Sequence, residues 1–119
     1  MSDCLFCKII AGEIPSTKIY DDEYVYAFAD IDPQAPFHAV VVPKIHITSA
    51  AEIDAYNSIY VSKIFEAIAK IAQQERLENG FRVVNNCGKD GGQTVGLYIF
   101  ICLPVVIFSG LPVDLLNEV

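Results

Sequence analysis

The sequence predicts an α+β fold, in which an antiparallel sheet packs with one long helix. Two observations lead to this class. Several short runs rich in Val, Ile, Phe and Tyr are bounded by Gly, Pro or Asp, as strands are. A single long segment has apolar residues at helical spacing, and it does not alternate regularly with the strands, which argues against a parallel sheet. The length of 119 residues corresponds to one domain.

The first half of the chain is predicted to contain a short helix or turn and three strands. The apolar segment Phe6–Ile10 forms the helix or turn and ends at Ala11-Gly12. Pro33 and Pro36 make residues 30–36 a loop. The strands are expected at Lys18–Tyr20, Glu23–Ala29 and Ala39–Val42, with a turn at Asp21-Asp22 and a stop at Pro43.

The long helix is predicted to begin near Ser49, because Ser49 and Glu52 have the spacing of a capping box. Asn79-Gly80 is expected to end it. Its apolar positions recur at intervals of three or four: Ile53, Tyr56, Tyr60, Ile64, Ile68 and Ile71. Two further strands are expected at Phe81–Val84 and Val95–Leu103, separated by a glycine-rich loop.

The charge balance limits the partners. Asp and Glu number 15 against 8 Lys and Arg, which gives a net charge of -7 and argues against duplex nucleic acid and anionic membranes. Hydrophobic residues nevertheless make up 53%, and residues 91–113 contain no charge. That run has the length of a membrane span, but Pro104, Gly110 and Pro112 interrupt it. A buried strand region is therefore favoured over membrane insertion.

The four cysteines are Cys4, Cys7, Cys87 and Cys102. No secretory signal precedes them, so a cytoplasmic location with reduced thiols is the default expectation. Cys4-x-x-Cys7 has the spacing of half a metal site, although a plain pair of reduced thiols and a redox pair are alternatives. His46 would give three ligands, one fewer than a structural zinc site uses. A solvated histidine is the other interpretation of His46.

Two further polar segments carry groups that a generic core does not need. Asp30, at the end of a predicted strand, could bind a ribose diol or simply cap a turn. The segment from Asn86 to Thr94 contains Gly88, Gly91 and Gly92, whose backbone N–H groups could approach an anion closely. A simple hairpin loop is the alternative for this segment.

Taken in order, these segments resemble the histidine-triad (HIT) family, in particular its nucleoside phosphoramidate hydrolases. The similar segments are Cys-Leu-Phe-Cys-Lys-Ile-Ile-x-Gly-Glu-Ile-Pro, Asp-Ile-Asp-Pro-Gln-Ala-Pro-x-His, Pro-Lys-x-His-Ile and Asn86 to Gly-Gly-Gln-Thr-Val. The resemblance extends from Cys4 to about Gly96. It implies an antiparallel sheet of about five strands with a long helix, dimerised through that helix and an edge strand.

The resemblance also implies roles for individual residues. Phe6, Ile9, Phe28 and Ile31 would line a purine pocket, and Asp30 would bind the ribose. His38 would buttress the catalytic histidine. Cys4, Cys7 and His46 would be three ligands of a structural zinc. The phosphate-side loop would comprise Asn86, Gly92, Gln93, Thr94 and Val95.

The family's defining His-x-His-x-His motif is missing. Leu97, Ile99 and Ile101 stand at its three histidine positions. The family's middle histidine attacks the α-phosphorus and forms a nucleotidyl-enzyme intermediate, and Ile99 has no lone pair with which to do so. Leu97 would have been the source of the fourth zinc ligand. The resemblance therefore predicts impaired catalysis, since loss of a nucleophile costs several orders of magnitude in rate.

A shifted reading frame would explain the unusual C-terminal tail. The degenerate codons of residues 97–119, taken two bases later, permit Leu-His-Phe-His-Leu-Leu-Ala-Gly-Arg, the family ending Trp-Pro-Pro-Gly and a stop. One base restored within codon 97 supplies the first histidine. We therefore expect a HIT-like domain over residues 1–103 and an aberrant apolar tail over residues 104–119.

Three functions compete at this point. The first is a HIT-type hydrolase by descent that binds purine nucleotides such as AMP and hydrolyses them negligibly. The second is a non-catalytic binding or scaffolding module that retains the purine pocket. The third, a membrane-attached protein that uses the tail, is the least favoured. Expected partners are a purine nucleotide, zinc and a second copy of the chain, and neither nucleic acid nor membrane.

Overall fold

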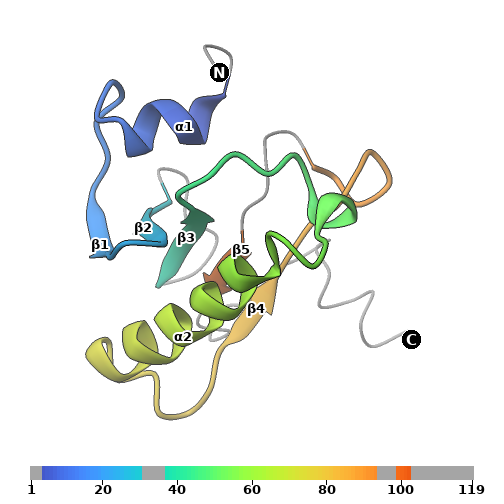
Figure 1. Ribbon diagram of the computed structural model, residues 1–119. Helices are drawn as coiled ribbons and strands as arrows, with labels where there is room; N and C mark the ends of the chain where they lie inside the picture. Colours follow the sequence, from blue (N-terminus) through green and yellow to red (C-terminus); the bar gives the residue numbers. More distant parts are fainter. Residues whose placement is uncertain (1–3, 31–36, 94–98, 103–119) are drawn as a thin grey trace.

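The computed structural model describes residues 4–30, 37–93 and 99–102. These residues form a five-stranded antiparallel sheet with the strand order β1-β2-β3-β5-β4 (Figure 1). The elements in chain order are α1 (Leu5–Ile10), β1 (Lys18–Asp21), β2 (Val25–Ala29), β3 (His38–Pro43), the 3₁₀ turn η1 (Ala50–Glu52), α2 (Ser58–Gln74), β4 (Arg82–Val84) and β5 (Ile99–Cys102). The predicted α+β class is confirmed, and the strands of the first half lie where the β-branched runs predicted them.

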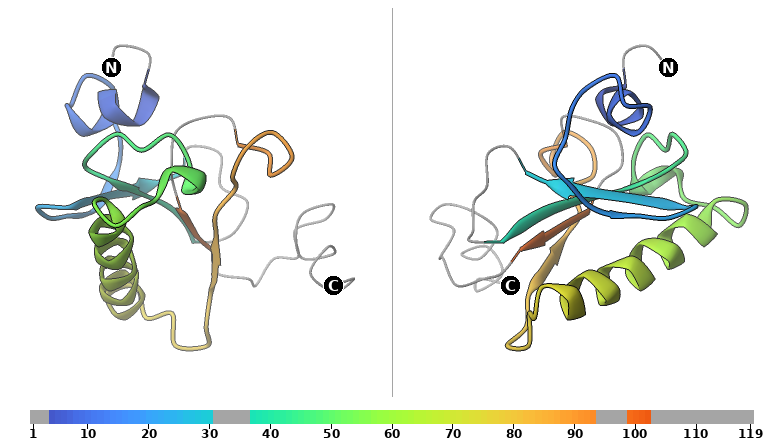
Figure 2. Two further views of the ribbon diagram at one scale, coloured as in Figure 1. Left: turned by 45° about the vertical axis from the view of Figure 1, so that its right-hand side comes forward. Right: turned by 90° about the vertical axis from the view of Figure 1, so that its left-hand side faces the viewer.

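The two helices pack on opposite faces of the sheet (Figure 2). Alternation along the strands explains this, because successive residues of a strand point to opposite faces. In β3, Ala39 and Val41 belong to the α2 side, whereas Val40 and Val42 belong to the α1 side. The central strand is therefore buried on both faces, and it separates a large core from a small one.

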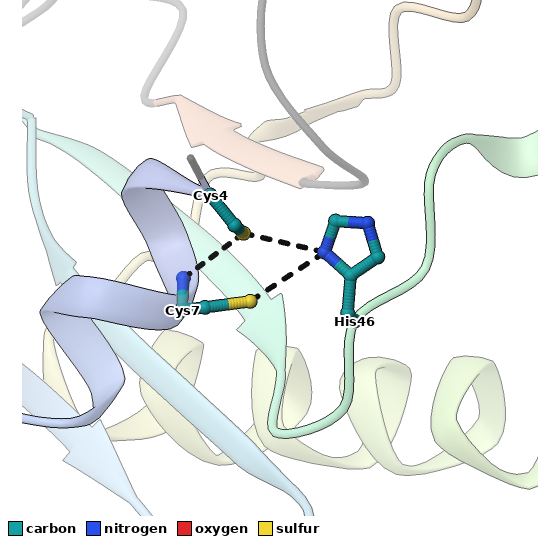
Figure 3. A group of neighbouring side chains, drawn as sticks. All are labelled: Cys4, Cys7 and His46. Atoms are coloured by element: carbon teal, nitrogen blue, oxygen red, sulfur yellow. Dashed lines mark hydrogen bonds between the residues drawn. The ribbon is translucent and has the colours of Figure 1, made fainter. Parts of the chain in front are cut away.

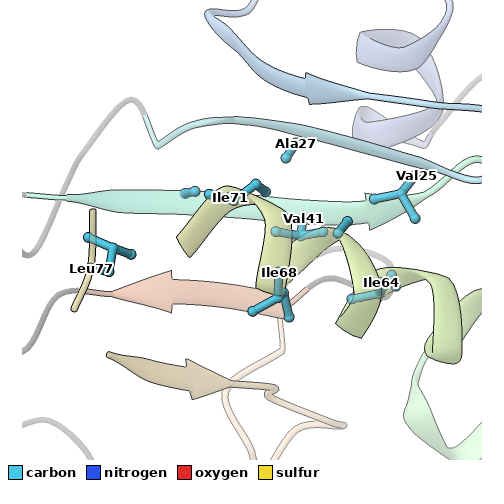
Figure 4. Close-up of a cluster of buried hydrophobic side chains, with 9 residues drawn as sticks. Val25, Ala27, Val41, Ile64, Ile68, Ile71 and Leu77 are labelled. Carbon is cyan, nitrogen blue, oxygen red and sulfur yellow. The ribbon is translucent and has the colours of Figure 1, made fainter. Parts of the chain in front are cut away.

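The large core lies between α2 and the sheet (Figure 4). Ile64, Ile68 and Ile71 recur on one side of α2 and are between 0% and 3% exposed. They pack with Val25 and Val41, which are fully buried. Burying each aliphatic side chain of this size stabilises the fold by about 1.5–3 kcal/mol. The helical spacing thus predicted the buried face of α2 correctly.

The predicted start of the long helix is wrong. Ser49 Oγ accepts a hydrogen bond from the Ala51 N–H at 3.2 Å, but the turn it caps is only η1. The chain then becomes extended at Ile53, and Asp54 Oδ1 accepts from the N–H groups of Tyr56 and Asn57. The Asp54 carbonyl also accepts from the Ser58 N–H at 3.0 Å, so Asp54, and not Ser49, caps the chain at the entry to α2. As a result α2 begins only at Ser58, and Tyr56 is 93% exposed.

The predicted end of the helix is also wrong. The N–H of Leu77 donates to the Ala72 carbonyl at 2.9 Å, and the N–H of Arg76 donates to the Gln73 carbonyl at 3.2 Å. This is the Schellman arrangement, with Arg76 in the left-handed position at φ 56° and Leu77 buried behind it. Burial of Leu77 requires the chain to turn there, so the helix ends before Asn79-Gly80.

The turn between β1 and β2 is held by Asp22. Its Oδ1 accepts hydrogen bonds from the N–H groups of Tyr24 and Val25, both at 2.8 Å, and its Oδ2 accepts from the Tyr20 hydroxyl at 2.7 Å. Partial burial by itself would raise the pKa of Asp22, but these three hydrogen bonds outweigh it and lower the pKa. The hydrogen bond between Tyr20 and Asp22 raises the pKa of Tyr20. The predicted turn is confirmed at Asp22, whereas Asp21 is still the last residue of β1.

The described part of the predicted last strand is confirmed, because β5 covers Ile99–Cys102. The remainder of the expected strand Val95–Leu103 and the expected tail 104–119 lie outside the described residues. Where the chain is described, no helix combines the length and the hydropathy that a membrane crossing requires.

Candidate functional site

Cys4, Cys7 and His46 converge where the start of α1 meets the segment that follows β3 (Figure 3). Cys4 is the N-cap of α1, and its Sγ accepts a hydrogen bond from the Cys7 N–H at 3.1 Å. His46 Nδ1 lies 3.3 Å from the Cys4 Sγ and 3.5 Å from the Cys7 Sγ. The cap therefore fixes both thiols on the side of α1 that His46 approaches.

These three residues fit a metal ion such as zinc. Their ligand atoms all lie within 4.8 Å of one another, and two sulfurs with one imidazole nitrogen are donors that zinc accepts. Burial, the hydrogen bond from Cys4 and the charge of Cys4 raise the pKa of Cys7 to about 11. Cys7 is thus a thiol at neutral pH, and a metal ion would have to displace its proton. Bound there, a metal would link α1 to the segment after β3.

The predicted purine-pocket residues Phe6, Ile9 and Phe28 lie together on the α1 face of the sheet. Ile9 and Phe28 belong to one buried cluster with Val40 and Val42, and Phe6 packs against it. The rings of Phe6 and Phe28 are 6.0 Å apart and inclined by 58°. Ile9 and Phe28 are only 9% and 7% exposed, so the half-buried Phe6 gives this apolar cluster its most accessible ring, a group against which a flat heterocycle can pack. The fourth predicted pocket residue, Ile31, lies outside the described residues.

Asp30 and His38 face each other across the ends of β2 and β3. The Asp30 N–H donates to the His38 carbonyl at 3.0 Å, which extends the ladder by one bond. Asp30 Oδ2 lies 3.2 Å from His38 Nε2. The His38 side chain is 4% exposed, whereas that of Asp30 is 18% exposed. The carboxylate can therefore hold the imidazole in place while part of it remains open to a hydroxyl group.

The register of β5 determines what stands beside His38. His38 pairs with Cys102, whereas Ile99 pairs with Val41. Val41 is fully buried in the α2-side core. Ile99 stands at the family's nucleophile position. It therefore lies three residues before Cys102, the residue of β5 that pairs with His38. Sequence comparison aligned position 99 but could not determine this register.

The glycine-rich loop is closed by Gln93. The Gly88 N–H donates to Gln93 Oε1 at 2.8 Å, and the Gln93 N–H donates to the Gly88 carbonyl at 3.0 Å. A Cβ on Gly91 would overlap the backbone of Cys87, so only glycine fits there. Gly92 adopts φ 78°, which also favours glycine. Thr94 and Val95 lie outside the described residues, and Asn86 is half-buried in the loop.

Sequence reasoning missed Thr48. Its carbonyl accepts a hydrogen bond from Gln93 Nε2 at 2.6 Å, so the glycine loop is tied to the segment that carries His46. A backbone carbonyl leaves no signal in the residue type, and only the fold could reveal this bond.

Comparisons with known proteins agree with this architecture. The family model described as HIT domain matches residues 11–97. Purine nucleoside phosphoramidase of Escherichia coli (strain K12) is 40% identical over 94 residues, which cover 78% of this chain and 79% of the relative. The "14 kDa zinc-binding protein" of Zea mays is 43% identical over 96 residues, covering 79% and 75%. A solved histidine triad protein from Clostridium difficile has a TM-score of 0.83 and 50% identity, covering 86% of this chain and 90% of that one.

Proposed function

The chain belongs to the histidine-triad (HIT) family, and on that basis we propose that it binds purine nucleotides such as AMP but hydrolyses them very slowly. One observation carries the binding half of the proposal. Phe6, with Ile9 and Phe28 buried behind it, forms an apolar cluster on the α1 face of the sheet. A purine would pack against the half-buried Phe6 ring, because aromatic rings accept flat heterocycles without needing charge.

Asp30 would supply the polar recognition. A carboxylate accepts hydrogen bonds from both hydroxyls of a ribose, and Asp30 keeps part of its side chain accessible beside His38. The glycine loop, which Gln93 closes onto Gly88, would lie on the phosphate side of the bound nucleotide. The relative named purine nucleoside phosphoramidase supports this choice of ligand.

Impaired hydrolysis follows from the residue at position 99. An isoleucine cannot attack phosphorus, and without that attack no nucleotidyl-enzyme intermediate forms. His38 would retain its place beside Asp30 but would have no nucleophile to buttress. The family phosphoramidase reaction is therefore proposed as the ancestral activity and not as an efficient activity of this chain.

We also propose zinc as the ion held by Cys4, Cys7 and His46. The convergence of their donor atoms supports it, as does the similarity to a plant zinc-binding protein. A homodimer and a cytoplasmic location complete the proposal, on the strength of the family resemblance. Residues 104–119 are proposed to be an aberrant tail that follows a domain over residues 1–103, and the family match ends at residue 97.

Calorimetric titration with AMP tests the binding half. We expect saturable binding, with a loss of about tenfold in the Asp30→Asn variant, since one amide cannot accept from two hydroxyls as a carboxylate does. Glu78→Gln, the same chemical change at an exposed residue of the α2–β4 connection, is the matched control. If the unchanged chain shows no saturable binding of AMP, the proposal is wrong.

A fluorogenic adenosine phosphoramidate tests the catalytic half. We expect turnover several orders of magnitude below that of the phosphoramidase from E. coli. Comparable turnover would contradict it.

The alternative, a non-catalytic scaffolding module, differs in that nucleotide binding would alter the affinity for a protein partner. Sequencing the DNA around codon 97 tests the shifted frame, because codons that cannot yield the alternative ending would exclude it.

A further inference from the structure

We propose that Gln93 is a positioning residue that couples metal binding at Cys4, Cys7 and His46 to the shape of the glycine loop. The side chain of Gln93 joins two segments that lie far apart in the sequence. Its Oε1 accepts from the Gly88 N–H, and its Nε2 donates to the Thr48 carbonyl. The coupling rests on the proposed metal site, and its last step, an effect on nucleotide affinity, rests in addition on the proposed nucleotide binding.

The first link runs from the metal ligands to Thr48. His46 is exposed, and only one residue separates it from Thr48 along the chain. The intervening Ile47 is 5% exposed and anchors the segment in the protein interior. A metal ion on His46 would fix the backbone on one side of this anchor. Because the segment is short, the Thr48 carbonyl on the other side would lose freedom as well.

The second link runs from Thr48 to the loop. The hydrogen bond from Gln93 Nε2 to the Thr48 carbonyl is 2.6 Å long, and the same amide group closes the ring with Gly88. Two backbone bonds tighten the ring further, from the Gly91 N–H to the Gly88 carbonyl and from the Gly92 N–H to the Lys89 carbonyl. A loop held this way keeps its shape before any ligand arrives.

Such coupling must be reciprocal. If the metal stabilises the ordered loop, then an anion on the loop raises the affinity for the metal by the same factor. One neutral hydrogen bond of ordinary strength corresponds to a factor of roughly threefold to tenfold. We therefore expect zinc to raise the affinity for AMP, and AMP to raise the affinity for zinc, by a factor in this range.

Hydrogen exchange of the full-length chain, followed by mass spectrometry with and without zinc, tests the coupling directly. Zinc should slow exchange of the amides in residues 87–93 of the unchanged protein. Gln93→Leu removes both side-chain bonds and should abolish this protection. Gln93→Glu keeps the acceptor for Gly88 but loses the donor to Thr48, so its loop should remain closed yet stop responding to zinc.

Gln74→Leu is the matched control. It removes a bond of the same kind, from Gln74 Nε2 to the Ile19 carbonyl at 3.3 Å, on the α2 side of the sheet. This variant should keep the zinc-induced protection of residues 87–93. Zinc affinity, measured by competition with a chromophoric chelator, should fall roughly threefold in the two Gln93 variants and stay unchanged in Gln74→Leu.

The outcomes separate this inference from the proposed function. Zinc-induced protection that is equal in Gln93→Glu and the unchanged chain would overturn the coupling, and so would its absence in the unchanged chain. If AMP binds equally well with and without zinc, the coupling to the nucleotide is overturned while nucleotide binding stands. If AMP fails to bind at all but zinc protects the loop through Gln93, the coupling stands and the proposed ligand is wrong.

Discussion

The Asp22 carboxylate accepts three hydrogen bonds from nearby residues in the turn between β1 and β2. Replacing it with alanine leaves two backbone N–H groups of the β1–β2 turn without their acceptor. We expect Asp22→Ala to lower the free energy of unfolding by roughly 1–2 kcal/mol, the cost of lost bonds to a charged acceptor at a partly exposed site. Urea denaturation measures this loss, and Asp22→Asn, which keeps one oxygen, should lose less.

The contribution of the Asp22 charge depends on pH in a definite direction. The hydrogen bonds overcome the effect of burial and lower the pKa of Asp22 below the ordinary range of an aspartate. A carboxyl with a lowered pKa in the folded state stabilises the protein above its unfolded-state pKa, and this stabilisation is lost as pH falls through the folded-state pKa. The difference between the unchanged chain and Asp22→Asn should therefore shrink below about pH 4. A difference that is constant down to pH 2 would contradict the assignment.

The predictability of the site also varied from residue to residue. The residue types and spacing of Cys4, Cys7 and His46 predicted three metal ligands, and the fold brings them together. Asp30 and His38 were expected in different roles, and their side chains turn out to be 3.2 Å apart. Thr48 could not be foreseen because its backbone oxygen, not its side chain, makes the contact. Residue type informs on side-chain chemistry but not on where a backbone group ends up.

At the scale of elements, α2 illustrates the limits of local signals. Its buried face follows from the spacing of Ile64, Ile68 and Ile71, since periodicity reflects packing. Its ends do not follow, because Asp54 captures backbone N–H groups before Ser58 and burial of Leu77 forces a turn after Gln74. Competing local bonds decide helix ends, and sequence signals such as the Ser49–Glu52 pair cannot rank those bonds.

Arg76 occupies a position that favours glycine. At φ 56° the Cβ of Arg76 crowds the backbone and strains this conformation. Glycine, which has no Cβ, removes that strain. We expect Arg76→Gly to raise the free energy of unfolding by roughly 0.5–1 kcal/mol. Thermal and urea denaturation measure the gain. Glu78→Gly is the control. Glu78 follows Arg76 by two positions and has no positive φ, so this change should not stabilise the protein.

The register of β5 bears on the simplest substitution that could be expected to restore catalysis. Ile99→His restores a histidine at the family's nucleophile position, but that position pairs with the fully buried Val41 and not with His38. Introducing an imidazole opposite the buried Val41 costs free energy, so we expect a destabilisation of roughly 1–3 kcal/mol. Because Leu97 and Ile101 still stand at the family's other two histidine positions, we expect no recovery of phosphoramidate hydrolysis. Denaturation and the fluorogenic assay measure both effects. Replacing residues 97–119 by the family ending restores all three histidines and is the positive control, and turnover by Ile99→His alone would contradict the need for the outer two.

At the scale of the whole molecule, the antiparallel sheet and the two-sided burial of β3 were implicit in the apolar runs. A strand without polar alternation must be covered on both faces, and α1 and α2 provide this cover. The strand order was not implicit, because β5 lies between β3 and β4 although it follows both in the chain. Long-range pairing of this kind depends on tertiary fit, which no local pattern encodes.

A bound metal should stabilise the whole domain through its link to α1. The described part of α1 is attached by the small cluster around Ile9 and Phe28 and by the Cys4–Cys7–His46 group. Zinc that binds only the folded state adds about 2.7 kcal/mol when its free concentration is one hundred times its dissociation constant. We expect zinc to raise the Tm by several degrees and a chelator to reverse it. In the Cys4→Ser variant the Tm should no longer respond to zinc.

The place of β5 in the sheet has a consequence for synthesis on the ribosome. Of the described strands, β5 is made last and joins the middle of the sheet, so β3 and β4 have no strand between them until residue 102 has left the exit tunnel. Until then both expose unpaired backbone groups along an open edge, which invites pairing with other chains. Folding of the sheet must therefore wait until residue 102 has emerged, and a ribosome that stalls before codon 99 would release a chain prone to aggregate.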